Sequence, residues 1–406
     1  MHKPMMKRNL FNFSTKDFRE INWPINAVVL LIMCVAFGIY DFYMDTGANL
    51  NAMISEALGN PSDYAHYFGG VDITTIMYCI TAAVILYIAG VAFFSYTLII
   101  KKSDEVERSK FKAILLSHLF TNAIDLIFSL AIFMIFGALL YLVTGNFMPL
   151  DELMDVASQQ LSALFDRIPT LVELPHPLGF FAAILMVDFA QWVKHWLTHQ
   201  SRFLWYVVHR VHHTPEIMHP FGIGPAFALE FILRLPIFIL TLAATKLFAE
   251  QPLYIETLLV TLLGVLIEKF NHSTAFYNFA YRNKVVKFIS MFYGGGVYHY
   301  THHSAIEGEE VNNLSGMGFM FWDRVFGTFV EPREEKPPVG LTHQPEIVLN
   351  PFALYFSGLQ KIIYELKHNE AKYWLKIIFG TMYFAPPNTH DTLILGYTKQ
   401  LVKKAI

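Results

Sequence analysis

The sequence predicts an all-α fold, a polytopic membrane bundle of helices with a histidine-rich helical cap on its cytoplasmic side. Only 16% of the 406 residues are charged and the mean hydropathy is +0.39, whereas soluble proteins are about 25% charged. The apolar residues also gather into stretches of about 20, the length that a helix needs to cross a bilayer. The small net charge of -3 argues against a nucleic-acid partner, which would require a concentrated basic face.

Six apolar stretches are candidate membrane spans. The first three are long, the fourth is short and runs directly into a histidine cluster, and the last two are close enough to predict a hairpin. In chain order they cover residues 24–43, 73–100, 113–144, 178–194, 225–247 and 252–270. Between the third and fourth spans, residues 151–165 predict an amphipathic helix on the far surface of the membrane.

Basic residues orient these spans, because loops rich in Lys and Arg stay in the cytoplasm. The N-terminal arm and the loop after the second span each carry five basic residues, whereas the loops after the first and third spans are acidic. Both chain ends are therefore predicted to be cytoplasmic in an integral, multi-pass membrane protein. The expected organisation is an N-terminal arm (1–22), a membrane region (23–177), a histidine-containing domain (178–330) and a cytoplasmic amphipathic tail (331–406).

The tail mixes aromatic and basic positions over residues 350–380. This pattern is typical of amphipathic helices. They are expected either to pack on the membrane surface or to cover the histidine-containing domain.

Nine of the 17 histidines lie in four short clusters. Imidazole is the commonest metal ligand in proteins, and residues three or four apart share one face of a helix, so each cluster can present its rings together. Nine rings exceed what one metal ion can use, and the pattern therefore predicts two. The clusters are His195 and His199; His209, His212 and His213; the single His272; and His299, His302 and His303.

All four clusters fall at the cytoplasmic ends of the predicted spans. A metal transporter would be expected to carry its ligands near mid-membrane, whereas here a lipid tail in the bilayer can meet a reactive centre at the interface. Nitrogen ligands suit iron, zinc, copper or nickel. Hydrolysis by a His-Glu-x-x-His zinc site is disfavoured, because Trp196 stands where the Glu would be. The pattern favours two redox metals and oxygen chemistry on lipids.

Four stretches around these clusters form a longer pattern. Asp188 to His199 forms a first box, Leu204 to His213 a second, and Phe270 to Ser273 surrounds the lone histidine. Tyr298 to His303, with Asn313 and with Trp322 to Thr328, forms a third. Together they resemble the fatty acid hydroxylase and sterol desaturase superfamily of membrane di-iron enzymes, over about a third of the chain.

The resemblance implies an O2-dependent oxidoreductase that holds two iron ions, which zinc could replace in purified material. Its reaction would be hydroxylation of an unactivated C–H bond in a fatty acyl, sterol or ether lipid. Desaturation and alkylglycerol-type ether oxidation are alternatives at the same site, and a metal-dependent lipid-binding protein without turnover is another. The sequence contains no flavin, haem or iron–sulfur motif, so a separate ferredoxin or cytochrome b5 type protein is expected to supply electrons.

The nine histidines are the expected metal ligands, and three further residues are candidates for support. Asp188, two helical turns before His195, either accepts a ring N–H or has a capping or packing role. Glu268 stands where some members of the superfamily have a second histidine, and it either binds iron or orients His272. Asn313 belongs to the trailing pattern of the third box.

Other positions depart from the superfamily or from the clusters. The stretch from Ala226 to Glu230 matches a common His-Pro-Leu-Glu sequence only at Glu230, so local substrate contacts are expected to differ. His219 is expected to be a surface or supporting residue rather than a haem ligand, and His118 is expected to be unrelated to the site.

Overall fold

The computed structural model describes residues 82, 86, 89–90, 105–145, 159–219, 222–253, 257, 260, 272, 277–292, 296–306, 309, 311–315, 318–341 and 349–389. The predicted span at 24–43, nearly all of those at 73–100 and 252–270, and Glu268 lie outside the described residues. Within the described ranges the secondary structure is helical, and strand-like pairing is limited to one isolated bridge between Ser304 and Val339. The all-α prediction is confirmed.

Three long helices account for three of the predicted spans. They are α4 (Glu105–Thr144), α6 (His176–Gln200) and α8 (Phe227–Thr245). Each contains a stretch long and apolar enough to cross a membrane, namely Phe111–Val143, Pro177–Gln200 and Ala228–Thr245. Helix α6 is longer than the predicted span at 178–194, because it continues without a break through the first histidine cluster.

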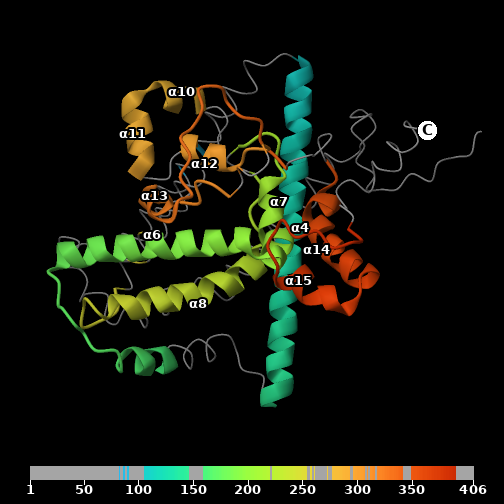
Figure 1. The fold of residues 1–406 in the computed structure, drawn as a ribbon. Coiled ribbons are helices and arrows are strands. Elements are labelled where there is room, and N and C mark those ends of the chain that lie inside the picture. The colour runs from blue at the N-terminus through green and yellow to red at the C-terminus, as the bar shows by residue number, and fades with distance from the viewer. Residues whose placement is uncertain are drawn as a thin grey trace, which may run out of the picture.

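The elements around the second histidine cluster join these long helices. Helices α6 and α8 run side by side, and α4 crosses them near the end that carries the histidines (Figure 1). There the chain passes through a π-helical turn, η4 (Leu204–His209), and directly into α7 (Arg210–His213). Before α6, residues 159–165 are helical, within the stretch predicted as an amphipathic surface helix.

Four short helices lie together on one side of α6 (Figure 1) and bring in the third histidine cluster. They are α10 (Tyr277–Arg282), α11 (Lys284–Phe292), α12 (Gly296–His302) and α13 (Phe321–Phe326). Of these helices, α10, α11 and α12 contact one another.

The tail helices pack against the long helix α4 and the second histidine cluster. They comprise α14 (Pro351–His368), the 3-10 turn η6 (Ala371–Tyr373) and α15 (Trp374–Phe379). Helix α14 contacts α4, η4 and α7. The approach is close at Gly358, where a Cβ atom would lie 1.6 Å from the carbonyl oxygen of Tyr206. Of the two arrangements expected for the tail, this is the one in which it covers the histidine-containing region.

A buried ion pair anchors the tail to the segment between the first two histidine clusters. The Arg202 guanidinium lies 2.6 Å from the Glu365 carboxylate, and both side chains are almost fully buried. Arg202 also donates hydrogen bonds to the carbonyl oxygens of Ile377 and Phe384, and its backbone N–H donates to that of Gly380. One arginine therefore links α14 and α15 to the end of α6.

Candidate metal centre

The nine predicted histidines lie together in two adjoining groups. Within each group the ligand atoms all lie within 4.8 Å of one another. The groups meet where the His213 ring stacks on that of His303, with 4.3 Å between ring centroids. The first group is His195, His199, His209, His213 and His302, and the second is His212, His272, His299 and His303.

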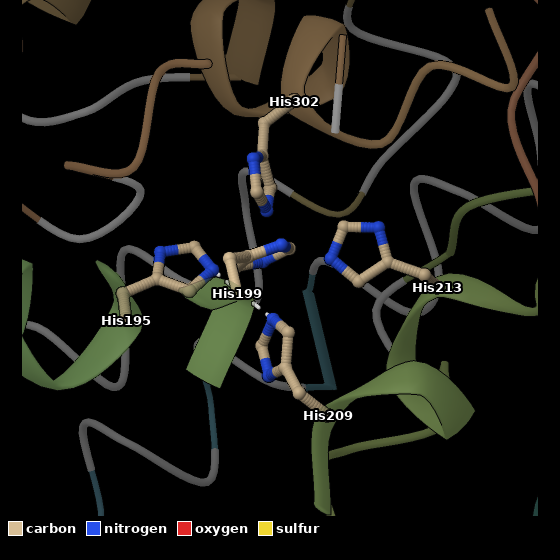
Figure 2. Close-up of side chains that lie close together, drawn as sticks. All are labelled: His195, His199, His209, His213 and His302. Carbon is tan, nitrogen blue, oxygen red and sulfur yellow. Dashed lines mark hydrogen bonds between the residues drawn. The ribbon is translucent and has the colours of Figure 1, made fainter. Parts of the chain in front are cut away.

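Each three-histidine cluster is divided between the two groups. His209 and His213, four residues apart, belong to the first group, whereas His212 between them belongs to the second. In the third cluster the division is reversed, since His299 and His303 belong to the second group and His302 to the first. Figure 2 shows the first group, with rings from α6, from η4 and α7, and from α12 converging on one volume.

A π-helical turn that contains His209 leads into the second cluster. A π turn contains one residue more than an α turn and is found most often at functional sites. Here the turn follows Arg202, which anchors the tail, and ends at His209. Helix α7 begins directly after it. The extra residue changes the direction in which His209 and the rings of α7 point relative to the end of α6.

Three of the rings are oriented by backbone carbonyl oxygens. The Nδ1–H groups of His195, His212 and His302 donate to the carbonyl oxygens of Leu314 (2.5 Å), Ile223 (2.8 Å) and Asn312 (2.8 Å). A proton on Nδ1 leaves the lone pair on Nε2, which is the tautomer that suits a metal ligand. Two of these rings, His195 and His302, belong to the first group, and His212 belongs to the second.

Inside the groups, ring nitrogens face one another or have no hydrogen-bond partner among the described residues. The Nε2 atoms of His195 and His209 lie 3.1 Å apart, and those of His299 and His272 lie 2.9 Å apart. Several buried Nε2 atoms have no hydrogen-bond partner, namely those of His199, His213 and His302. Buried polar atoms are nearly always paired, so these nitrogens fit a site that is completed by metal ions.

Burial favours the neutral form of several of these histidines. None of the nine is more than 8% exposed. Outside the membrane-spanning segments, burial and then the neighbouring histidines hold the pKa values of His209, His213, His299 and His303 well below 6.5. Burial lowers the pKa of His302 to about 3, although the bond to Asn312 opposes this shift. A neutral imidazole is the form that binds a metal.

A cavity of about 40 Å3 lies against both groups. It is lined by His195 and His209 of the first group and by His212, His272 and His299 of the second. A water molecule needs at least about 10–15 Å3 by this measure, so the cavity has room for a molecule as small as O2 beside the rings.

Two aspartates support the loop that holds the first group. Asp188 accepts hydrogen bonds from the backbone N–H of Phe319 and from the Trp322 indole. Of the two expectations for Asp188, this is the packing role, because its carboxylate bonds to this loop rather than to a histidine ring. The fully buried Asp323 accepts from the backbone N–H groups of Leu314 and Ser315.

Asp323 also accepts from the Trp192 indole and the Thr328 hydroxyl. Since the Leu314 carbonyl receives the His195 ring N–H, Asp323 fixes the position of that acceptor. Asp323 lies within the Trp322-to-Thr328 pattern of the third box, and no role for it was predicted. The feature that could have indicated this role is that Asp323 is the one acidic residue in the mostly apolar Phe321–Phe326 segment.

Asn313 lies in the same loop and contacts backbone rather than a ring. Its φ is +53°, in the left-handed region that asparagine tolerates better than most residues. The side chain donates to the Tyr298 and Val330 carbonyl oxygens and accepts from the Val330 N–H. Asn313 thereby ties α12, which carries the third cluster, to the end of the domain.

The two remaining histidines of interest form a separate buried pair. His118 on α4 and His219 lie 2.7 Å apart between Nδ1 and Nε2, and their rings stack. Neither belongs to the two groups. His219 is 1% exposed, so the expectation of a surface position is wrong. Its side chain is covered because its ring packs against Phe111 and His118 of α4.

Residues 180–328 match the family model described as fatty acid hydroxylase. This part of the chain is similar to a fatty acid hydroxylase domain. The matched stretch contains all nine histidines, and it ends at Thr328, the last residue of the trailing pattern in the third box. A search of the curated proteins and a search of the solved structures found no match.

The match to the fatty acid hydroxylase family model supports an enzyme, and the three apolar helices favour a membrane protein. The two histidine groups of the matched stretch could hold metal ions.

One group of contacts in the matched stretch was not anticipated from the sequence. Lys194 and Arg234 both contact Glu230, at 2.7 and 2.9 Å, next to the small cavity.

Proposed function

We propose that the protein is a membrane-bound di-iron oxygenase that hydroxylates an unactivated C–H bond of a lipid. The observation that carries this proposal is the pair of adjoining, buried, all-histidine groups. They lie in a fatty acid hydroxylase domain, at the end of two helices that are apolar enough to cross a membrane.

In this proposal each group holds one iron ion. Two iron ions, when bound, would supply activation of O2 and removal of hydrogen from an unactivated carbon. This assignment is supported by the Nε2 atoms that have no hydrogen-bond partner and by a set of metal ligands that are all nitrogen atoms. Zinc accepts the same ligands. The ligands would be His195, His199, His209, His213 and His302 for one ion, and His212, His272, His299 and His303 for the other.

The chain's own residues hold, orient and enclose the reactants. The carbonyl oxygens of Leu314, Ile223 and Asn312 hold three rings in the metal-binding tautomer. Burial of the site excludes bulk water, which would otherwise divert a reactive oxidant. The lipid chain enters from the bilayer, and the site faces the cytoplasm in a multi-pass protein, as the basic loops favour.

The overall reaction requires a source of electrons. One C–H bond, one O2, two electrons and two protons give one C–OH group and one water. Because the sequence has no motif for a flavin, haem or iron–sulfur cofactor, a separate ferredoxin or cytochrome b5 type protein supplies the two electrons.

Lipid profiling of host membranes tests the proposal. Mass spectrometry of lipids with and without the gene should reveal a lipid with one added oxygen, formed only with O2. A lipid with two fewer hydrogens would instead indicate desaturation, and a cleaved ether would indicate ether oxidation. No change in any lipid would overturn the oxidoreductase assignment.

Variants from both groups link this product to the metal site. His302→Ala in the first group and His212→Ala in the second should each abolish the product and lower the iron content of native membranes by about half. His118→Ala removes a buried histidine outside both groups and should retain the metal and the product. Unchanged product in His302→Ala and His212→Ala would contradict the proposed site.

A further inference from the structure

A second and larger cavity, of about 440 Å3, lies between α6 and α8. Its volume falls within the range of about 300–1,000 Å3 that is usual for small-molecule sites. The wall is mostly apolar, with Val187 and Ala190 from α6 and with Phe231, Leu235 and Phe238 from α8. Both helices are candidate spans, so the cavity runs along segments that face lipid.

This large cavity shares a wall with the small one beside the histidines. Gln191, Lys194, Glu230 and Arg234 line both. The large cavity extends from these residues along α8 as far as Thr241, about three helical turns from Glu230. It therefore leads from the histidine end of α6 and α8 into their apolar part.

The shared wall is polar and largely fixed in place. One carboxylate oxygen of Glu230 pairs with both the Lys194 ammonium and the Arg234 guanidinium. The Lys194 and Glu230 side chains are less than a tenth exposed. At Gln191, the Oε1 atom is buried and has no hydrogen-bond partner among the described residues. An unsatisfied buried acceptor costs free energy, which a ligand with an O–H or N–H group would recover.

We propose that the large cavity holds the hydrocarbon chain of the lipid substrate and that Gln191 Oε1 accepts a hydrogen bond from an O–H or N–H group of the same lipid. This inference rests on the proposed function and adds to it a substrate class and a specificity residue. The chain lies along α8 and the polar group lies at the shared wall. The carbon that reaches the histidine groups is therefore within a few bonds of the polar group, and not at the end of the chain.

A pair of matched variants tests the cavity. Leu235 lines it, whereas Leu240, on the same helix, is 67% exposed and does not. Leu235→Trp fills part of the cavity and should shift the lipids that co-purify with the protein towards shorter chains, as measured by mass spectrometry. Leu240→Trp should leave the distribution of chain lengths as in the wild type. Equal distributions in the two variants would overturn the cavity assignment.

A second comparison tests Gln191. The probes are a long-chain alcohol and its methyl ether, mixed equally in phosphatidylcholine vesicles that contain the purified protein. The wild type should retain the alcohol about threefold to tenfold better, the value of one hydrogen bond. Gln191→Leu should lose this preference, and Gln191→Glu, which keeps an acceptor, should restore it. A preference for the alcohol that persists in Gln191→Leu would overturn the role of Gln191.

These retention measurements do not depend on turnover, so the two proposals can fail separately. If the chain-length shift and the alcohol preference appear but no lipid is oxidised, the proposed function fails and the binding site stands. If a lipid is oxidised but Leu235→Trp and Gln191→Leu behave like the wild type in retention, the binding site fails and the proposed function stands.

Discussion

The orientation of the histidine rings depends on main-chain carbonyl oxygens, and the acidic residues act one step further away. Asp323 does not touch a ring, but it holds the backbone N–H of Leu314, whose carbonyl oxygen receives the Nδ1–H of His195. Hydrogen bonds to an ionised carboxylate are stronger than those between neutral groups. The position of this loop is therefore part of the metal site.

Asp323→Asn should weaken the site without removing a ligand. An amide keeps the shape of the side chain but loses the negative charge and one acceptor, so the Leu314 carbonyl is held less firmly. We expect metal affinity to fall about 10- to 100-fold, measured by chelator competition. Asp166→Asn, at an exposed position, is the control. Equal affinities in the two variants would contradict a role for Asp323 in positioning His195.

Gly318→Ala should disturb the same loop by steric overlap. A Cβ atom at Gly318 would lie 1.1 Å from the Asp188 carboxylate, so the loop or Asp188 must move. Overpacking of this kind costs about 1–3 kcal/mol, and the thermal unfolding midpoint should fall. Gly137→Ala on α4, where nothing lies within 4 Å of the added carbon, should not lower the midpoint. A fall in Gly137→Ala alone would contradict this explanation.

At this scale the identity of the histidines was predictable, and their grouping was not. Spacing of three and four residues reveals rings on one helical face, which is why eight of the nine positions could be named. His272 was named because it accompanies the other clusters and matches the lone histidine of the superfamily. The division of each three-histidine cluster between two groups depends on how separate helices meet, and no local residue pattern predicts the π turn that contains His209. The role of Asp323 depends on a contact with Trp192, which is distant in sequence, and on the turn that brings back the backbone of Leu314.

At the scale of elements, the tail is held to the histidine-containing region by a buried cluster of charges. Glu365 on α14 pairs with Arg202 and with Lys361, and it accepts a hydrogen bond from the Thr389 hydroxyl. The Arg202 guanidinium also lies over the Tyr206 ring of η4. Docking of the tail is thus coupled to the segment that leads into the second histidine cluster.

Glu365→Gln should release this docking. It leaves two cations in a buried position without their anion, and breaking a buried ion pair in this way costs about 3–5 kcal/mol. We expect faster proteolysis between the fatty acid hydroxylase domain and α14, together with a lower unfolding midpoint. Glu370→Gln, which alters an exposed pair with Lys372, should change neither. Protease resistance equal to that of the wild type would show that the pair does not hold the tail.

The helices themselves were largely predictable, because apolar stretches locate α4, α6 and α8, although α4 begins at Glu105, well before the predicted span at 113–144. The end of α6 was set too early, since Lys194 and the first histidines interrupt the apolar pattern. In the structure Lys194 is neutralised by Glu230, so the helix continues. The choice between a tail on the membrane and a tail over the domain could not be made, because the partner of Glu365 lies far away in sequence.

At the scale of the whole molecule, the buried histidines couple stability to pH. The pKa values of His209, His213, His299 and His303 lie well below 6.5 in the folded protein, and that of His302 is about 3. In the unfolded chain they return to about 6.5. Below that pH the unfolded chain binds protons that the folded protein excludes, so protons favour unfolding.

The metal-free protein should therefore lose stability as the pH falls below about 6.5 and should change little above it. Each histidine contributes a slope of up to about 1.4 kcal/mol per pH unit, and for His302 the loss continues towards pH 3. Thermal unfolding of chelator-treated protein between pH 8 and pH 5 measures this effect. His302→Gln should reduce the slope. A midpoint that does not change below pH 6.5 would contradict the burial of neutral rings.

The π turn at Leu204–His209 makes the site sensitive to the length of the chain as well as to its composition. Deleting one residue from this turn would leave every histidine in the sequence and would favour an ordinary α-helical turn in its place. His209, His212 and His213 would then rotate together by about 100°, one residue's share of an α-helical turn. A relative with all nine histidines but one residue fewer here could retain the motif and lack the centre.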